Sequence, residues 1–228
     1  MDLPRENLPP FRPEGPGAQP AGSASPLPGR ALSRQVVFVR HGETDWSKSG
    51  RHTGRTDIPL STQGINNARL LAGHLPFARF EHVFTSPRQR AKSTCELAGL
   101  GALARTDPDL AEWDYGDYEG LRSADILARR PDWNLFRDGC PGGESPEQIS
   151  ARADRLIARL RLLEGAIALF SHGHFGRVLA ARWIGLGAVH GERLLLDTAS
   201  LGILGYEHGD ASAPAIALWN ARPKEPAS

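Results

Sequence analysis

The stretch from Gln35 to Trp46 constrains the fold of this chain more than any other part of the sequence. Residues 36–39 are all apolar, and because three of the four are β-branched valines they predict a buried β-strand. Arg40 and His41 follow at the point where that strand would end. Ligands bind open α/β sheets at the carboxyl ends of the strands. A cationic arginine beside a titratable histidine at that edge therefore predicts an anionic ligand.

A second stretch repeats this pattern. The apolar residues 166–170 predict another strand, and Ser171, His172 and Gly173 follow directly after it. Because crossover connections between parallel strands keep one hand, we expect both strands in one sheet, with their histidines at one edge. The predicted architecture is an α/β fold, a three-layer α/β/α sandwich around a mostly parallel sheet.

Periodicity and turn residues organise the rest of the chain. Ser61 or Thr62 can cap a helix with apolar residues at a spacing close to 3.6, and Pro87 suits the first turn of a second helix. Residues 99–143 carry many aromatic residues but little periodicity, and we interpret them as an inserted lid. The remaining expectations are helices over 62–75, 87–98, 146–163 and 173–186, and strands over 83–85, 202–206 and 215–219.

Length and composition indicate one folded domain. The 228 residues are 40% hydrophobic and 23% charged, which suits a single domain with its own core. The first thirty residues contain eight Pro and four Gly, a composition typical of disorder. We predict a disordered Pro/Gly-rich extension over residues 1–34, the folded domain over 35–220 and a flexible tail over 221–228.

Charge and cysteine content exclude several kinds of protein. The 27 basic and 26 acidic residues give a net charge of +1, so the chain lacks the basic field typical of nucleic-acid binding. No apolar run approaches the length of a membrane helix or forms a signal-peptide core. Cys95 and Cys140 are the only cysteines, and they lack the spacing of a disulfide framework or a zinc site. These features predict a cytoplasmic protein with no nucleic-acid or membrane partner.

The side chains expected near the strand ends suit phosphoryl transfer. A neutral imidazole such as that of His41 is a competent nucleophile toward phosphorus, and the transition state spreads negative charge over three equatorial oxygens. Arg40 and Arg90 offer planar guanidinium groups for those oxygens, and His172 offers a further donor. Because the arginines supply the positive charge, we expect neither a metal ion nor another cofactor.

The leaving alkoxide needs a proton donor, which we expect in residues 112–120. Glu112 can protonate the leaving oxygen and then, as a carboxylate, activate the water that hydrolyses the phosphohistidine, a role worth about 10²–10⁴ in rate. Asp114, Asp117 and Glu119 lie in the same segment, and spacing alone does not choose among the four carboxylates.

Residues 40–44, Arg-His-Gly-Glu-Thr, resemble the signature of the histidine phosphatase superfamily, which includes the cofactor-dependent phosphoglycerate mutases. The resemblance covers about residues 35–220 and continues through motifs at 54–60, 86–91, 118–120, 142–145 and 171–173. It implies a phosphoglycerate mutase-like fold and a phosphohistidine at His41. It also implies a phosphate pocket of Arg40, Arg90 and His172, with Glu112 as the proton donor.

Longer motifs at residues 46–50, 112–120 and 133–140 resemble the sedoheptulose-1,7-bisphosphatase branch of this superfamily. His52 is a departure, because it stands where that branch has a tyrosine. The resemblance to this branch implies four candidates for binding the sugar or a second phosphate, namely Thr53, Tyr115, Arg177 and His208.

The resemblance implies a metal-independent phosphomonoesterase that acts through a phosphohistidine on a small phosphorylated metabolite, a sugar phosphate or bisphosphate. One alternative is a cofactor-dependent phosphoglycerate mutase, and another is a non-catalytic phosphate-binding regulatory module. Mutases carry an asparagine where this chain has Ser47, and a longer interval than that from Glu112 to His172, which favours hydrolysis. The oligomeric state, a homo-oligomer included, stays open.

Overall fold

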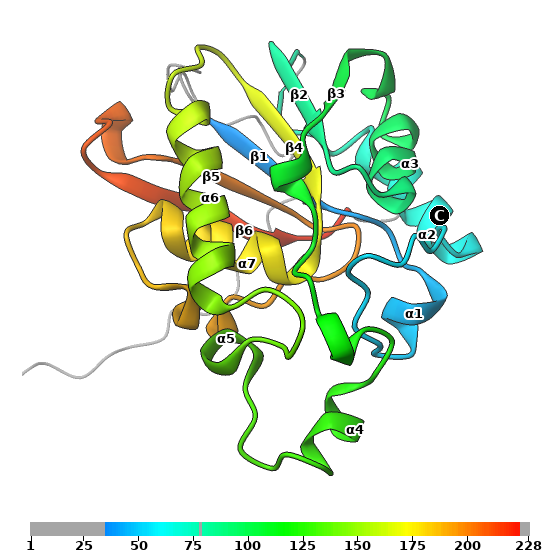
Figure 1. Ribbon diagram of the computed structural model, residues 1–228. Coiled ribbons are helices and arrows are strands. Elements are labelled where there is room, and N and C mark those ends of the chain that lie inside the picture. The colour runs from blue at the N-terminus through cyan, green and yellow to red at the C-terminus, as the bar shows by residue number, and fades with distance from the viewer. Residues whose placement is uncertain (1–34, 78, 224–228) are drawn as a thin grey trace, which may run out of the picture. The chain divides into compact units, whose positions relative to one another are not determined.

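The computed structural model of the protein describes residues 35–77 and 79–223 (Figure 1). The extension predicted over residues 1–34 lies outside the described residues, as does most of the predicted tail. The tail was predicted to begin at residue 221, but Ala221 still belongs to the sheet, where it pairs with Leu201. Arg222 then donates a hydrogen bond to Asp197, so the folded part extends beyond residue 220.

The structure contains one six-stranded sheet in the order β3-β2-β4-β1-β5-β6, in which every strand except β3 was predicted. The first four of these strands run parallel to one another, whereas β5 is antiparallel to β1 and β6 is antiparallel to β5. The mostly parallel sheet predicted from the sequence is therefore confirmed. The strands are β1 (Val36–Arg40), β2 (His82–Thr85), β3 (Ala104–Thr106), β4 (Ile167–Ser171), β5 (Leu201–Tyr206) and β6 (Pro214–Ala221).

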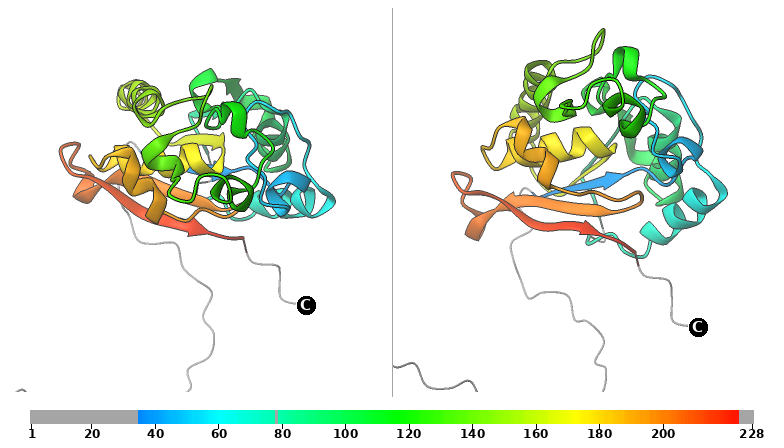
Figure 2. Two further views of the ribbon diagram at one scale, coloured as in Figure 1. Left: turned by 60° about the horizontal axis from the view of Figure 1, so that its bottom comes forward. Right: turned by 90° about the horizontal axis from the view of Figure 1, so that it is seen from below.

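Helices cover both faces of the sheet. Val36 and Phe38 of β1 pack in one apolar cluster with α6 and α7, which lie together on one side of the sheet in Figure 2. Val37 and Val39 point to the opposite face and join a second cluster with α2 and α3. This arrangement is the predicted three-layer α/β/α sandwich. The helices are α1 (Asp45–Lys48), α2 (Thr62–Leu71), α3 (Gln89–Leu97), α4 (Ser123–Leu127), α5 (Leu135–Asp138), α6 (Pro146–Leu160) and α7 (Gly173–Trp183).

Two local predictions need correction. Helix α3 begins at Gln89, because Arg88 before it is extended (φ −78°, ψ 137°), so Pro87 lies outside the first turn. The segment 99–143 is not simply an inserted lid. It contains the parallel edge strand β3, and the aromatic rings of Trp113 and Tyr115 are buried in the core. Within this segment, α4 lies farthest from the sheet (Figure 1).

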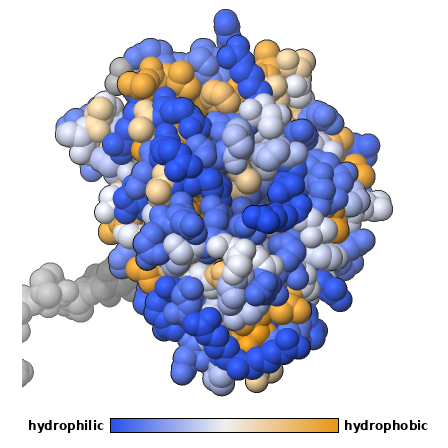
Figure 3. Space-filling view, in the orientation of Figure 1, coloured by the Kyte–Doolittle hydropathy of each residue, from blue (hydrophilic) through white to orange (hydrophobic). Residues whose placement is uncertain are grey.

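The face of the molecule that Figure 3 shows is largely hydrophilic. On the face shown in Figure 3, apolar residues lie in small groups separated by hydrophilic ones. Within the described ranges, 35–77 and 79–223, no helix combines the length and the apolar character needed to cross a membrane.

Two glycines bring the loop after β1 against α2. A Cβ atom added to Gly42 would lie 2.5 Å from the carbonyl oxygen of Gly64, and one added to Gly64 would overlap the carbonyl oxygen of Glu43. Such distances are far inside van der Waals contact, and the atoms met are backbone atoms that cannot rotate away. The close approach fixes the backbone of Gly42 and Glu43, the two residues that follow His41.

We predict that Gly64→Ala destabilises the protein. Alanine normally stabilises a helix interior relative to glycine by about 1 kcal/mol, but here the methyl group overlaps the Glu43 backbone. The expected loss of unfolding free energy is about 1–3 kcal/mol, measured by urea denaturation. Gly73→Ala is the matched control, because its added Cβ meets no heavy atom within 4 Å. An equal effect of the two substitutions would contradict this account.

Candidate active site

The pairing of β1 with β4 brings the two predicted histidines together. Arg40 is opposite Ser171 in the parallel register, so His41 and His172 follow at the same carboxyl edge of the sheet. Their ring centroids lie 5.1 Å apart. The structure therefore places both histidines where the repeated strand pattern predicted them.

The imidazole of His41 is held in one tautomer. Its Nδ1 lies 2.7 Å from the carbonyl oxygen of Gly42, and a carbonyl can only accept, so Nδ1 carries the proton. The lone pair is then on Nε2. Burial, together with the charges of Arg90 and Arg40, holds the pKa of His41 well below the ordinary value of 6.5. A buried, neutral imidazole with a free Nε2 is the form that a nucleophile needs.

Arg40 presents an unpaired donor to the same edge. One of its Nη atoms donates to the carbonyl oxygen of Leu196 at 2.5 Å, but its Nε is buried and has no partner among the described residues. Gly173 leaves room for the guanidinium, because a Cβ there would lie 3.1 Å from its central carbon. A buried N–H without a partner costs about 1–3 kcal/mol, so this group suits an incoming anion.

Arg90 is completely buried and is largely occupied by protein acceptors. Its Nη1 donates to Thr56 O at 3.0 Å, and its Nη2 donates to Thr53 O and Gly54 O at 2.9 and 3.2 Å. Its Nε donates to Nδ1 of His172 at 3.2 Å. These bonds leave one Nη1 hydrogen of the guanidinium for a ligand. Arg90 therefore orders the loop 53–56 and also places a positive charge in the pocket.

The tautomer of His172 follows from its contact with Arg90. A guanidinium has no acceptor atom, so Nδ1 of His172 accepts and Nε2 carries the proton. That N–H lies 2.7 Å from the hydroxyl oxygen of Ser86. Burial, followed by the charge of Arg90, holds the pKa of His172 well below 6.5. His172 is thus a neutral imidazole at the edge of the pocket, with its one N–H bonded to Ser86 and its lone pair to Arg90.

Glu112 lies at the amino-terminal end of α7, the helix that follows His172. Its carboxylate accepts from the backbone N–H groups of Trp113 and Phe175 at 2.9 and 2.8 Å and from that of His174 at 3.1 Å. Only 8% of Glu112 is exposed. Backbone donors at a helix amino terminus fix a carboxylate in both position and orientation.

The other carboxylates of this segment have different environments. Asp114 forms an ion pair with Arg55, and Glu119 accepts from the backbone N–H groups of Gly54 and Thr56. Asp117 is exposed. Of the four carboxylates, Glu112 is the one bonded to the backbone N–H groups of His174 and Phe175, which directly follow His172 and Gly173.

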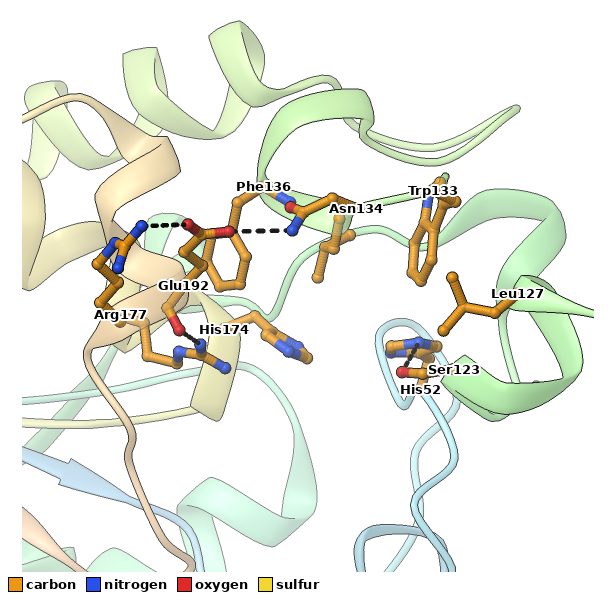
Figure 4. Close-up of a pocket in the computed structure, with 11 residues that line it drawn as sticks. His52, Ser123, Leu127, Trp133, Asn134, Phe136, His174, Arg177 and Glu192 are labelled. Carbon is orange, nitrogen blue, oxygen red and sulfur yellow. Dashed lines mark hydrogen bonds and ion pairs between the residues drawn. The ribbon is translucent and has the colours of Figure 1, made fainter. Parts of the chain in front are cut away.

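A cavity of about 520 Å³ lies next to this group (Figure 4). His41 does not line it. Tyr115 packs behind its wall, with its ring 4.7 Å from that of His52 and its hydroxyl 2.6 Å from Nδ1 of His174. The lining residues combine aromatic, polar and charged side chains: His52, Ser123, Leu127, Trp133, Asn134, Leu135, Phe136, His174, Arg177, Glu192 and Arg193.

The four predicted substrate-binding residues have different positions. Arg177 lines the cavity, and Tyr115 lies behind its wall. Thr53 contributes its carbonyl to Arg90, while its hydroxyl donates to Arg51 O. His208 lies elsewhere: its side chain is 87% exposed and 3.7 Å from Glu207.

The prediction for His208 is wrong for a topological reason. His208 follows β5, which runs antiparallel to β1. The end of β5 therefore lies at the amino edge of β1, opposite the edge that carries His41.

Several supporting residues were missed by the sequence analysis. Ser86 accepts from His172, and Arg152 donates to the backbone carbonyls of Asp109 and Ala111 and to the Glu144 carboxylate, beneath Glu112. Nothing in the sequence distinguished Arg152 as a supporting residue, because it is one of several arginines on an amphipathic helix. His174 has its ring in the cavity wall, and its place in the His-Gly-His sequence at residues 172–174 was an available signal. Within the described ranges, no group of three or more His, Cys, Asp or Glu is arranged to hold a metal ion.

An α/β sandwich with two histidines and two arginines at one sheet edge defines the class of protein. The chain belongs to the histidine phosphatase superfamily (branch 1), whose family model matches residues 36–222. The predicted fold and family are confirmed, and the protein is a phosphatase, a phosphoric monoester hydrolase.

Individual relatives agree with this assignment. The chain is 43% identical to an acid phosphatase of Mycobacterium tuberculosis over 181 residues, 78% of this chain and 89% of that protein. It is 34% identical to the sedoheptulose 1,7-bisphosphatase of Saccharomyces cerevisiae over 254 residues, 82% of this chain and 93% of that protein. The solved structure of an M. tuberculosis open reading frame product matches with a TM-score of 0.79 at 38% identity, covering 84% of this chain and 99% of that one.

We predict that acid destabilises the protein through its buried histidines. Burial lowers the pKa of His52 from 6.5 to about 4, against the opposing effect of the Glu119 carboxylate. Below pH 6.5 the unfolded chain therefore binds more protons, and the unfolding free energy falls until about pH 4. The share of His52 in the loss between pH 7 and pH 5 is about 2 kcal/mol.

His52→Gln cannot take up this proton. Urea denaturation at both pH values should therefore give the variant a smaller acid-induced loss than the wild type, by about that amount. An identical loss in both proteins would remove His52 from the explanation.

Proposed function

We propose that the protein hydrolyses sugar phosphates through a phosphohistidine formed at Nε2 of His41. The observation that carries this proposal is the hydrogen bond from Nδ1 of His41 to the Gly42 carbonyl, which leaves Nε2 unprotonated. The free donors of Arg40 and Arg90 face the proposed position of the transferring phosphoryl group, and His172, whose ring bonds Arg90 and Ser86, lies beside them. Their fixed positive charge and N–H groups stabilise the equatorial oxygens in the transition state.

The reaction has two steps. In the first, His41 Nε2 forms a bond to phosphorus while the bond from phosphorus to the leaving oxygen breaks, and Glu112 gives its proton to that oxygen. In the second, Glu112 takes a proton from water, whose oxygen attacks phosphorus and releases inorganic phosphate from His41. Glu112 thus regains in the second step the proton that it gives up in the first, and His41 ends unphosphorylated, as it began.

The cavity beside the pocket suits the leaving alcohol. Arg177 and Asn134 offer polar contacts, and Trp133 and Phe136 offer apolar ring surface of the kind that packs against sugar carbons. We retain Thr53, Tyr115 and Arg177 as candidates for binding the alcohol or a second phosphate. The yeast relative's bisphosphatase activity on sedoheptulose supports this substrate class for the present chain. Cys95 and Cys140 are free, buried thiols, which supports a reducing compartment such as the cytoplasm.

A phosphoglycerate mutase is the alternative within the same chemistry. A mutase equilibrates 3- and 2-phosphoglycerate and needs 2,3-bisphosphoglycerate for priming, whereas a phosphatase releases inorganic phosphate promptly. The absence of acid-labile, alkali-stable phosphate on His41 with every substrate tested would instead support the non-catalytic module.

We predict that His41→Ala abolishes phosphate release from a panel of sugar phosphates, because it removes the proposed nucleophile and the unprotonated nitrogen of the neighbouring His172 is occupied by Arg90. His208→Ala is the matched control, because His208 is exposed at the opposite edge of the sheet. It should retain wild-type kcat/KM. Colorimetric phosphate release and mass-spectrometric detection of the phosphorylated peptide measure the two outcomes. Normal turnover by His41→Ala would end the proposed mechanism.

We predict that Glu112→Gln slows substrates with poor leaving groups more than activated ones. An alkoxide needs the proton, so hydrolysis of a sugar phosphate should fall by about 10²–10⁴. The p-nitrophenolate ion leaves without protonation, so p-nitrophenyl phosphate should give a much smaller decrease in its burst of product. Equal slowing of both substrates would mean that another carboxylate, not Glu112, is the general acid.

A further inference from the structure

His174 lies between the phosphate pocket and the cavity, and the mechanism above does not use its side chain. Its backbone N–H donates to Glu112 at 3.1 Å, and its Nδ1 lies 2.6 Å from the Tyr115 hydroxyl. The ring packs 5.6 Å from that of Phe136 and 5.8 Å from that of His52. Figure 4 shows it projecting into the cavity across from His52.

The second ring nitrogen of His174 is free to bind a ligand. Nε2 has no hydrogen-bond partner within residues 35–77 and 79–223, and it belongs to a ring that lines the cavity. Tyr115 and the neighbouring rings fix the orientation of the imidazole, so Nε2 keeps its place when a ligand enters. A polar atom held in this way loses little conformational entropy on binding.

The surroundings keep both partners of this hydrogen bond uncharged. Burial, followed by the charge of Arg177, lowers the pKa of His174 well below 6.5. Burial and the Glu112 carboxylate raise the pKa of Tyr115 well above 10. A neutral imidazole has one donor and one acceptor nitrogen. His174 can therefore bond Tyr115 on one side and a hydroxyl group on the other in either tautomer, because a hydroxyl both donates and accepts.

We propose that His174 is a specificity-determining residue that binds a hydroxyl group of the leaving alcohol, so that the enzyme selects the phosphate monoesters of polyols. This inference rests on the proposed function and names the feature of the substrate that is read. The position fits the role, because the backbone of His174 holds the proposed proton donor while its side chain faces the alcohol. Because one residue holds both Glu112 and the substrate hydroxyl, a hydroxyl group bound to Nε2 of His174 sets the position of the leaving oxygen relative to Glu112.

The aromatic residues of the cavity complete this recognition. The ring of Trp133 lies 5.8 Å from that of His52, and Phe136 packs against His174. A polyol presents C–H groups to such rings and hydroxyl groups to the imidazoles between them. An alcohol without hydroxyl groups would enter the same space but leave Nε2 of His174 without a partner, which costs affinity.

The test compares His174→Phe and His174→Gln with the wild type on two substrates. One is the best substrate from a panel of triose to heptose phosphates, and the other is p-nitrophenyl phosphate, whose leaving group carries no additional hydroxyl. For His174→Phe we expect kcat/KM to fall about 10- to 100-fold on the sugar phosphate, mainly through KM. The change on p-nitrophenyl phosphate should be below about threefold. His174→Gln keeps a donor and an acceptor and should lie closer to wild type on the sugar phosphate.

Each other outcome is decisive. An equal loss on both substrates would overturn the inference, because it is the result expected if His174 acts only by supporting Glu112 or Tyr115. An unchanged kcat/KM on the sugar phosphate would overturn it as well. Activity on p-nitrophenyl phosphate shows that a variant is folded. If the wild-type enzyme hydrolyses none of the sugar phosphates, the proposed function itself is wrong. That result is obtained before any variant is made, so it is distinct from a failure of the inference about His174.

Discussion

The parallel pairing of β1 with β4 is the constraint on which the whole site depends. It sets Arg40 opposite Ser171, and the residues that follow each strand, His41 and His172, are thereby placed at one edge with their rings 5.1 Å apart. Every other proposed catalytic group is positioned relative to this pair. Helix α7 begins beside His172 and holds Glu112 with backbone N–H groups at its amino terminus. The strand register is in turn fixed by burial, because residues 36–39 are enclosed on both faces of the sheet and a one-residue slip would exchange the two faces.

Positive charge is concentrated at this edge although the chain as a whole carries only +1. Arg40 and Arg90 are held close to two imidazoles, and burial makes protonation of those imidazoles unfavourable. As a result, the guanidinium groups stay charged and the two histidines stay neutral. The edge therefore carries uncompensated positive charge, which suits the phosphoryl dianion of the proposed function, and the buried Nε of Arg40 has no partner among the described residues.

Arg90 has a second role that its charge alone does not suggest. Three backbone carbonyls of residues 53–56 accept hydrogen bonds from its guanidinium, and the carboxylate of Glu119 accepts from the N–H groups of Gly54 and Thr56. The loop is thus fixed from both its carbonyl side and its amide side. Because His52 precedes this loop and lines the cavity, the order that Arg90 imposes extends from the phosphate pocket to the alcohol side of the site. Phosphate binding and alcohol binding therefore share one rigid support.

The residues that could be predicted from the sequence are those placed by strand ends, and the residues that could not are those placed by loops. Buried strands have a strong apolar signal, so the sheet, His41 and His172 followed from the pattern of residues 36–42 and 166–173. His208 was misplaced because its assignment came from a resemblance, and an antiparallel strand delivers its end to the far edge of the sheet. His174 and Arg152 depend on contacts across segments 59 and 41 residues apart in the chain, Tyr115 with His174 and Ala111 with Arg152. Such contacts arise only when the sheet and its helices are assembled, and no local periodicity encodes them. Motif residues therefore fix the chemistry at the sheet edge, whereas the selection of the alcohol depends on tertiary packing around the cavity.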